Sequence, residues 1–125
     1  MKPALLVIDM QKAFLDLDPA TKASLESATE YINEAIRYFR ESHLPVIVIQ
    51  HKNESENLVP GVDAFDVLDT LHLLESDARV VKTYGNAFNQ TPLLDLLREQ
   101  GVDTVIITGF QAEGCVLSTE RGARD

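Results

Sequence analysis

Four short apolar runs divide the chain, and longer amphipathic patterns lie between them. The runs cover residues 4–8, 46–49, 79–81 and 104–108. In the first, second and fourth runs the apolar residues are continuous and rich in β-branched types, with no regular alternation of polar ones. Such runs are typical of strands covered on both faces, as in a parallel sheet. The pattern therefore predicts a sheet of four strands.

Two segments between the runs have the spacing of amphipathic helices. The first begins at Asp18-Pro19, since a capping carboxylate before a first-turn proline favours a helix start. Its apolar positions recur at intervals of three and four: Leu25, Ala28, Ile32, Ala35, Ile36 and Phe39. The second runs from Thr91-Pro92 to Gly101, with an expected inner face of Leu93, Leu94, Leu96 and Leu97. Because strands and helices alternate, we expect a doubly wound α/β fold, with a mainly parallel sheet and helices on both faces.

Segment 52–77 has the least regular pattern. Its first half carries loop-forming residues, Asn53, Asn57, Pro60 and Gly61. Its second half has apolar residues at helical spacing, which predict a short helix: Val67, Leu68, Leu71 and Leu74. A long loop after a parallel strand is a common place for a substrate lid, and an irregular surface loop is the equally good alternative.

Length and composition fit one ordinary globular domain. The 125 residues are 45% hydrophobic and 25% charged, and we interpret residues 1–125 as a single domain. No run approaches the eighteen or so apolar residues of a membrane-spanning helix. The first apolar run ends at Asp9, without the cleavage pattern of a signal peptide. We therefore expect a cytoplasmic protein with no membrane partner.

Charge and cysteine content exclude further kinds of partner and site. The net charge is −9, from 11 basic and 20 acidic residues. Nucleic-acid binding depends on Lys and Arg displacing phosphate counterions, so we expect no nucleic-acid partner. The single cysteine, Cys115, excludes an internal disulfide and a multi-thiolate metal site.

Three residues with useful chemistry follow strands of the predicted sheet. Asp9 comes directly after the first strand, Lys82 after the third, and Cys115 a short loop after the fourth. Each has a simpler explanation on its own: a turn cap, a surface lysine and a buried small side chain. Ligands of open α/β sheets bind beyond the carboxyl ends of the strands, where all three fall together. Their joint placement predicts an active site.

The segments around these residues resemble the isochorismatase-like cysteine hydrolases. Three motifs carry the resemblance in order: Leu5-Leu6-Val7-Ile8-Asp9-Met10-Gln11, Lys82-Thr83-Tyr84-Gly85-Asn86-Ala87-Phe88 and Gly109-Phe110-Gln111-Ala112-Glu113-Gly114-Cys115-Val116. The family includes nicotinamidases, N-carbamoylsarcosine amidases, related amide and ureido hydrolases, and isochorismatases. The resemblance implies a catalytic triad of Asp9, Lys82 and Cys115 acting on a small-molecule amide.

The chemistry of these groups agrees with the implied roles. A cysteine at a helix N-terminus beside a cation is stabilised as the thiolate, and Lys82 would supply that cation. Asp9 would take the thiol proton and later protonate the departing amine. The resemblance implies that the backbone N–H groups of Gln111 and Cys115 form the oxyanion hole, and that the Phe110–Gln111 peptide is cis.

Four more residues are candidates for lining or supporting the site: Gln11, Phe14, Tyr84 and Phe88. Phe14 and Phe88 fit a hydrophobic core equally well. Nicotinamidases of the family hold a metal with an Asp-x-His set and a later histidine. Here His51 is present, but Ile49 stands where that aspartate would be. We therefore expect no metal and no cofactor, and interpret His51 as a pocket-lining or surface residue.

The chain ends where the resemblance leads us to expect two further strand–helix units. The predicted domain is therefore incomplete at its C-terminus, or another polypeptide covers the exposed edge of the fourth strand. An uncovered edge of this composition favours aggregation.

Two alternative functions stay open. One is the vinyl ether hydrolysis of isochorismatases, and the other is a non-catalytic ligand-binding protein with a redox-reactive cysteine. The family also implies a homo-oligomer, either a dimer or a tetramer.

Overall fold

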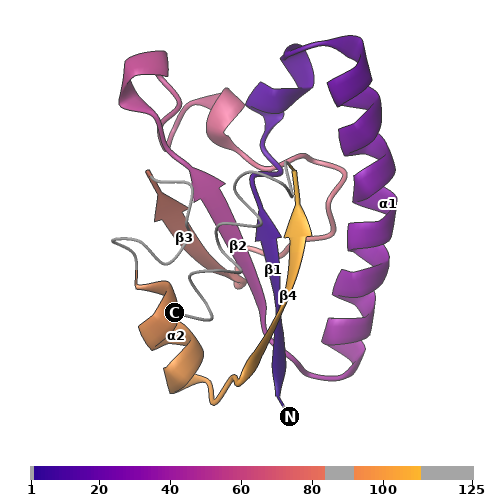
Figure 1. Cartoon of the computed structure of the whole chain (residues 1–125), viewed down its shortest axis with the longest axis vertical. Coiled ribbons are helices and arrows are strands. Elements are labelled where there is room, and N and C mark those ends of the chain that lie inside the picture. The colour runs from indigo at the N-terminus through magenta and orange to yellow at the C-terminus, as the bar shows by residue number, and fades with distance from the viewer. Residues whose placement is uncertain (1, 84–91, 111–125) are drawn as a thin grey trace.

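A four-stranded parallel sheet forms the centre of the molecule. The computed structural model describes residues 2–83 and 92–110. The strands are β1 (Pro3–Ile8), β2 (Val46–His51), β3 (Ala78–Lys82) and β4 (Thr104–Gly109), in the spatial order β3-β2-β1-β4. All neighbouring pairs are parallel, so the four arrows in Figure 1 point the same way. The predicted strands and fold class are confirmed.

Helix α1 (Pro19–Glu41) covers one face of the sheet and α2 (Leu93–Glu99) covers the other (Figure 1). The predicted start of α1 is confirmed, because the Asp18 side chain accepts a hydrogen bond from the Thr21 N–H at 2.7 Å. After α2 the chain turns at Gly101, whose φ of 69° is the left-handed conformation common just past a helix end.

The alternation of side chains along the buried strands divides the core in two. Ala4, Leu6 and Ile8 of β1 face α2, whereas Leu5 and Val7 face α1. Strands β1 and β2 are buried on both faces, as their continuous apolar runs predict.

Strand β4 is less covered than its sequence predicts. Its residues are partly buried, and Ile106 is 44% exposed. The reason is its position, because β4 is the outermost strand next to β1 in the described sheet. The expectation of an edge position for this strand is confirmed, and the expectation of full burial on both faces is wrong.

Two details of the predicted helices are also wrong. Leu94 lies on the solvent side of α2 and is 44% exposed, while Leu93 and Leu97 face the core. No helix forms over residues 67–74; segment 52–77 contains only two short 3-10 turns, η2 (Glu54–Glu56) and η3 (Asp63–Phe65). None of the helices described in residues 2–83 and 92–110 is long and apolar enough to span a membrane.

Candidate active site

Asp9 and Lys82 meet at the carboxyl edge of the sheet, as predicted. Asp9 follows β1, and its N–H donates to the Ile49 carbonyl of β2 at 3.0 Å. The apolar run predicts Lys82 directly after the third strand, whereas in the structure it is the last residue of β3. Because β2 lies between these strands, the Lys82 side chain reaches across the end of β2 to Asp9.

The backbone of Asp9 has an unusual conformation that brings its carboxylate to Lys82. Lys82 shares the face of Val80, which belongs to the core on the α2 side. Asp9 follows Ile8, which faces α2, so a regular strand would direct Asp9 towards α1. Instead Asp9 has φ 58°, in the left-handed region. Non-glycine residues in this region are uncommon and concentrate at functional sites.

The two charged groups form a buried pair. Lys82 is 1% exposed and Asp9 is 2% exposed. Lys82 Nζ lies 3.4 Å from each carboxylate oxygen and donates a hydrogen bond to Oδ2. Asp9 Oδ1 is buried and has no hydrogen-bond partner among the described residues. Buried polar atoms are nearly always hydrogen-bonded, so an unpaired carboxylate oxygen here is a candidate proton acceptor.

The chain leaves β4 beside Ile8, the residue before Asp9. The Phe110 N–H donates to the Ile8 carbonyl at 3.1 Å. Gly109 has φ 136°, and a Cβ at this position would lie 2.0 Å from the Ile8 oxygen. Only glycine permits this close approach. The first residues of the segment that leads to Cys115 are therefore held against the residue before Asp9.

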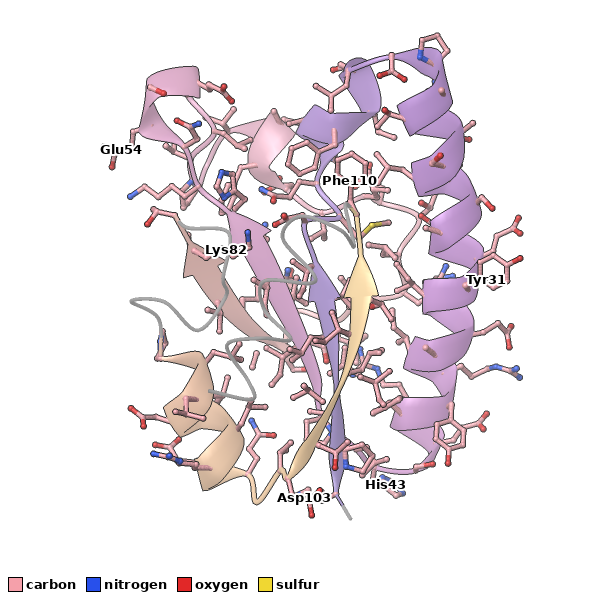
Figure 2. The ribbon with its side chains drawn as sticks, viewed as in Figure 1. Tyr31, His43, Glu54, Lys82, Asp103 and Phe110 are labelled. Carbon is pink, nitrogen blue, oxygen red and sulfur yellow. The ribbon has the colours of Figure 1, made fainter. Side chains whose placement is uncertain are left out.

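Phe14 supports the same segment. It lies in the 3-10 helix η1 (Lys12–Asp16), and its ring packs against Phe110 with centroids 5.2 Å apart. Phe110 lies beyond the end of β4, at the same edge of the sheet as Lys82 (Figure 2). Of the two roles predicted for Phe14, packing is the one that the described contacts show.

Gln11 makes contacts of the supporting kind, one of the two roles predicted for it. Its side chain is fully buried and pairs with the backbone of His51: Nε2 donates to the carbonyl at 3.0 Å, and Oε1 accepts from the N–H at 2.8 Å. Nε2 also donates to the Phe65 carbonyl at 2.9 Å. Gln11 thus continues the pairing with β2 beyond the end of β1, and it fixes the end of β2 to segment 52–77.

Segment 52–77 forms a fixed wall above the sheet. Met10 and Lys12 exchange backbone hydrogen bonds with Leu68 and Asp66, in a short antiparallel bridge centred on Gln11. Lys12 Nζ also lies 3.1 Å from carboxylate oxygens of Asp63 and Asp69. These hydrogen bonds raise the pKa of Lys12 above its ordinary value. Four buried side chains of the segment anchor it to the rest of the molecule: Leu58, Phe65, Leu68 and Leu71.

His51 is a third titratable group at this edge. It is the last residue of β2 and the register partner of Lys82. The ring is partly buried, and its Nδ1 is a buried atom with no hydrogen-bond partner among the described residues. Burial and the nearby Lys82 ammonium lower the pKa of His51, outweighing the opposite effects of Asp9 and Glu56. The imidazole is therefore neutral at neutral pH.

Comparison with known proteins shows the family of the chain. The family model described as the isochorismatase domain matches residues 3–125. The chain belongs to the isochorismatase family.

Several members of the isochorismatase family are similar to this chain. The uncharacterized protein YrdC of Bacillus subtilis is 30% identical over 96% of this chain and 65% of its own length. The maleamate amidohydrolase of Pseudomonas putida is 26% identical over 92% of this chain and 62% of its own. The crystal structure of N-carbamoylsarcosine amidase from Thermoplasma acidophilum superposes with a TM-score of 0.85, at 30% identity, over 98% of this chain and 76% of that one. The chain thus spans less than two thirds of the length of both curated relatives.

Other residues proposed from the family motifs lie outside the described residues. These are Cys115, Gln111, Tyr84 and Phe88, together with the Phe110–Gln111 peptide. Their roles stay predictions.

The absence of a metal also stays a prediction. Within the described ranges, no three His, Cys, Asp or Glu residues are grouped as a metal site. His51 lies beside Lys82, and an ammonium group disfavours a cation close by.

Proposed function

We propose that this protein is a cysteine hydrolase that cleaves the C–N bond of a small amide or ureido compound. Cys115 is the nucleophile, Asp9 the general base and acid, and Lys82 the cation that stabilises the thiolate. The observation that carries the proposal is the buried Asp9–Lys82 pair, in which Asp9 Oδ1 has no described hydrogen-bond partner. The names of two relatives, an amidohydrolase and an amidase, support this class of reaction.

The first half of the reaction forms a thioester. Asp9 takes the proton of the Cys115 thiol, and the sulfur attacks the carbonyl carbon of the substrate. The backbone N–H groups of Gln111 and Cys115 stabilise the resulting oxyanion. The C–N bond then breaks, and the proton on Asp9 passes to the departing amine. The Lys82 ammonium lowers the energy of both anions, the thiolate and the Asp9 carboxylate.

The second half returns the enzyme to its starting state. Water gives a proton to Asp9 as it adds to the thioester carbonyl, the C–S bond breaks, and the thiolate takes the proton from Asp9. The sum is amide plus water to carboxylic acid plus amine.

Trapping the acyl intermediate tests the proposal. The full-length protein is incubated with a panel of small carboxamides and ureido compounds, and released ammonia is measured. One sample is quenched without further addition and Cys115 is examined by peptide mass spectrometry, whereas a second sample receives hydroxylamine, which diverts the thioester to a hydroxamate. We expect an acyl adduct on Cys115, and hydroxamate formation that disappears in Cys115→Ala.

Three results would contradict the proposal. Equal ammonia release by the wild type and Cys115→Ala would show that Cys115 is not the nucleophile. Turnover of isochorismate without any acyl adduct would favour vinyl ether hydrolysis. Ligand binding without turnover of any compound would favour the non-catalytic alternative.

A further inference from the structure

Two buried polar side-chain atoms lack a hydrogen-bond partner in residues 2–83 and 92–110, and both lie at the carboxyl edge of the sheet. One is Asp9 Oδ1, which the proposed reaction uses as a proton acceptor. The other is His51 Nδ1, which the reaction does not use. Leaving a buried polar atom unpaired destabilises the folded state, so each such atom requires a physical explanation. A substrate that hydrogen-bonds His51 would provide one.

The order of the strands determines which part of a substrate His51 can reach. The nucleophile follows β4, and Asp9 follows β1, its neighbour. In the proposed reaction, the scissile bond is therefore expected above β1 and β4. Strand β2, which carries His51, is on the opposite side of β1 from β4. A substrate held between Cys115 and Asp9 would extend its remaining atoms over β2, towards His51.

The surroundings of His51 fix its position. Both backbone hydrogen-bonding groups of His51 are paired with the Gln11 side chain, at 2.8 and 3.0 Å. Its register partner on β3 is Lys82, whose Nζ is directed to Asp9. The site thus has a positive group for the reaction and, beside it, an imidazole that is neutral because burial and the Lys82 charge disfavour its protonation. A neutral imidazole offers one donor and one acceptor.

We infer that His51 binds the non-scissile part of the substrate through Nδ1 and determines which amides the enzyme accepts. This inference rests on the proposed function. The chemical class that fits is a small amide carrying a second uncharged hydrogen-bonding group, such as another amide, a few atoms from the scissile carbonyl. A purely hydrocarbon amide of the same length leaves Nδ1 unpaired and is a poorer substrate.

A matched pair of substrates tests the inference. Succinamide carries a second amide group, whereas butyramide has the same chain length without it. We expect the wild type to prefer succinamide by about tenfold or more in kcat/KM, mainly through a lower KM, since one well-placed hydrogen bond is worth about this factor. In His51→Phe the preference disappears, and in His51→Asn, whose amide takes the place of Nδ1, part of it returns.

Alkylation of Cys115 by iodoacetamide distinguishes a specificity role from a structural one. It should be unchanged within about twofold in both His51 variants, because this reaction requires no contact with His51. An equal succinamide preference in wild type and His51→Phe would overturn the inference. So would a loss of alkylation in His51→Phe as large as the loss of kcat/KM, since that pattern indicates a disturbed site.

A binding measurement separates failure of this inference from failure of the proposed function. In Cys115→Ala no thioester can form, so an amide binds without reacting. Nitrogen-15 spectra of the histidine rings are recorded as succinamide or butyramide is added. We expect succinamide to shift the His51 ring signals, assigned with His51→Phe, and not those of His43 or His72. Absence of turnover would contradict the proposed function alone, whereas absence of this shift, or an equal shift with butyramide, would overturn the role of His51.

Discussion

At the scale of single residues, the site depends on one strained aspartate and one buried lysine. Asp9 has a left-handed backbone, and its carboxylate is almost completely buried against Lys82. Neither feature stabilises the folded protein by itself: left-handed conformations at non-glycine residues and buried charges both raise its free energy. Their presence together is typical of a site where function is favoured over stability.

A double-mutant cycle measures the coupling of this pair. Lys82→Met leaves the buried Asp9 charge without this cation, so we expect a loss of about 3–5 kcal/mol in the free energy of unfolding. Asp9→Asn combined with Lys82→Met removes both charges. The double variant should lose clearly less free energy of unfolding than the sum of the losses in the two single variants. Urea unfolding gives the values. Additive losses would show that the two side chains are not energetically coupled.

The lowered pKa of His51 predicts a pH dependence of stability. Between the folded-state pKa and the unfolded value of about 6.5, the unfolded chain binds more protons than the folded one. The free energy of unfolding therefore falls as pH decreases from about 7 through this window. Urea unfolding at several pH values should show a steeper fall for the wild type than for His51→Phe. Parallel profiles would contradict the assignment.

At the scale of elements, the ends of the strands were easier to predict from sequence than the conformation of the loops after them. The apolar runs, including the short third one, located β1, β2 and β3, and hence the meeting of Asp9 with Lys82. The pattern of Val67, Leu68, Leu71 and Leu74 was misleading because an anchored loop also needs apolar residues at intervals. Leu68 and Leu71 pack into the α1 side of the core from a loop held by Met10 and Asn33.

Long-range hydrogen bonds are the feature of the candidate site that the sequence could not predict. The pairing of Gln11 with the His51 backbone joins residues forty positions apart. His51 Nδ1 lacks a hydrogen-bond partner among the described residues, and this depends on where the Gln11 pairing holds the His51 backbone. A polar residue two positions after a strand-end aspartate is the only signal for Gln11, and it does not distinguish lining the site from supporting it.

The junction of β4 with the site depends on Gly109. In Gly109→Ala the new Cβ would overlap the Ile8 oxygen at 2.0 Å, so the backbone must move. We expect a loss of about 3 kcal/mol or more in the free energy of unfolding. Gly61→Ala is the matched control: its φ is 95°, but no atom lies within 4 Å of the new Cβ. It should cost only the backbone strain, about 1–2 kcal/mol. Equal losses measured by thermal unfolding would show that the close approach is unimportant.

At the scale of the whole molecule, β4 is an outer strand of the described sheet and exposes an apolar side chain. Ile106 is 44% exposed on this strand. Exposed apolar edge strands favour association with other chains. Ile106→Lys should therefore reduce concentration-dependent association of the 125-residue chain, measured by sedimentation. Leu17→Lys, which changes a leucine 58% exposed just before α1, is the control and should have little effect. If both substitutions reduced association equally, exposed apolar side chains in general, and not the edge of β4, would cause it.

In the proposed site, the Asp9–Lys82 pair activates Cys115. The most direct test is the pH dependence of iodoacetamide alkylation at Cys115 in the full-length protein, followed by peptide mass spectrometry. We expect rapid alkylation below neutral pH in the wild type and in Lys82→Arg, which keeps the positive charge. In Lys82→Met, shown to be folded by circular dichroism, the midpoint should rise towards the ordinary thiol value of about 8.5. A midpoint near about 8.5 in all three proteins would show that Lys82 does not activate Cys115.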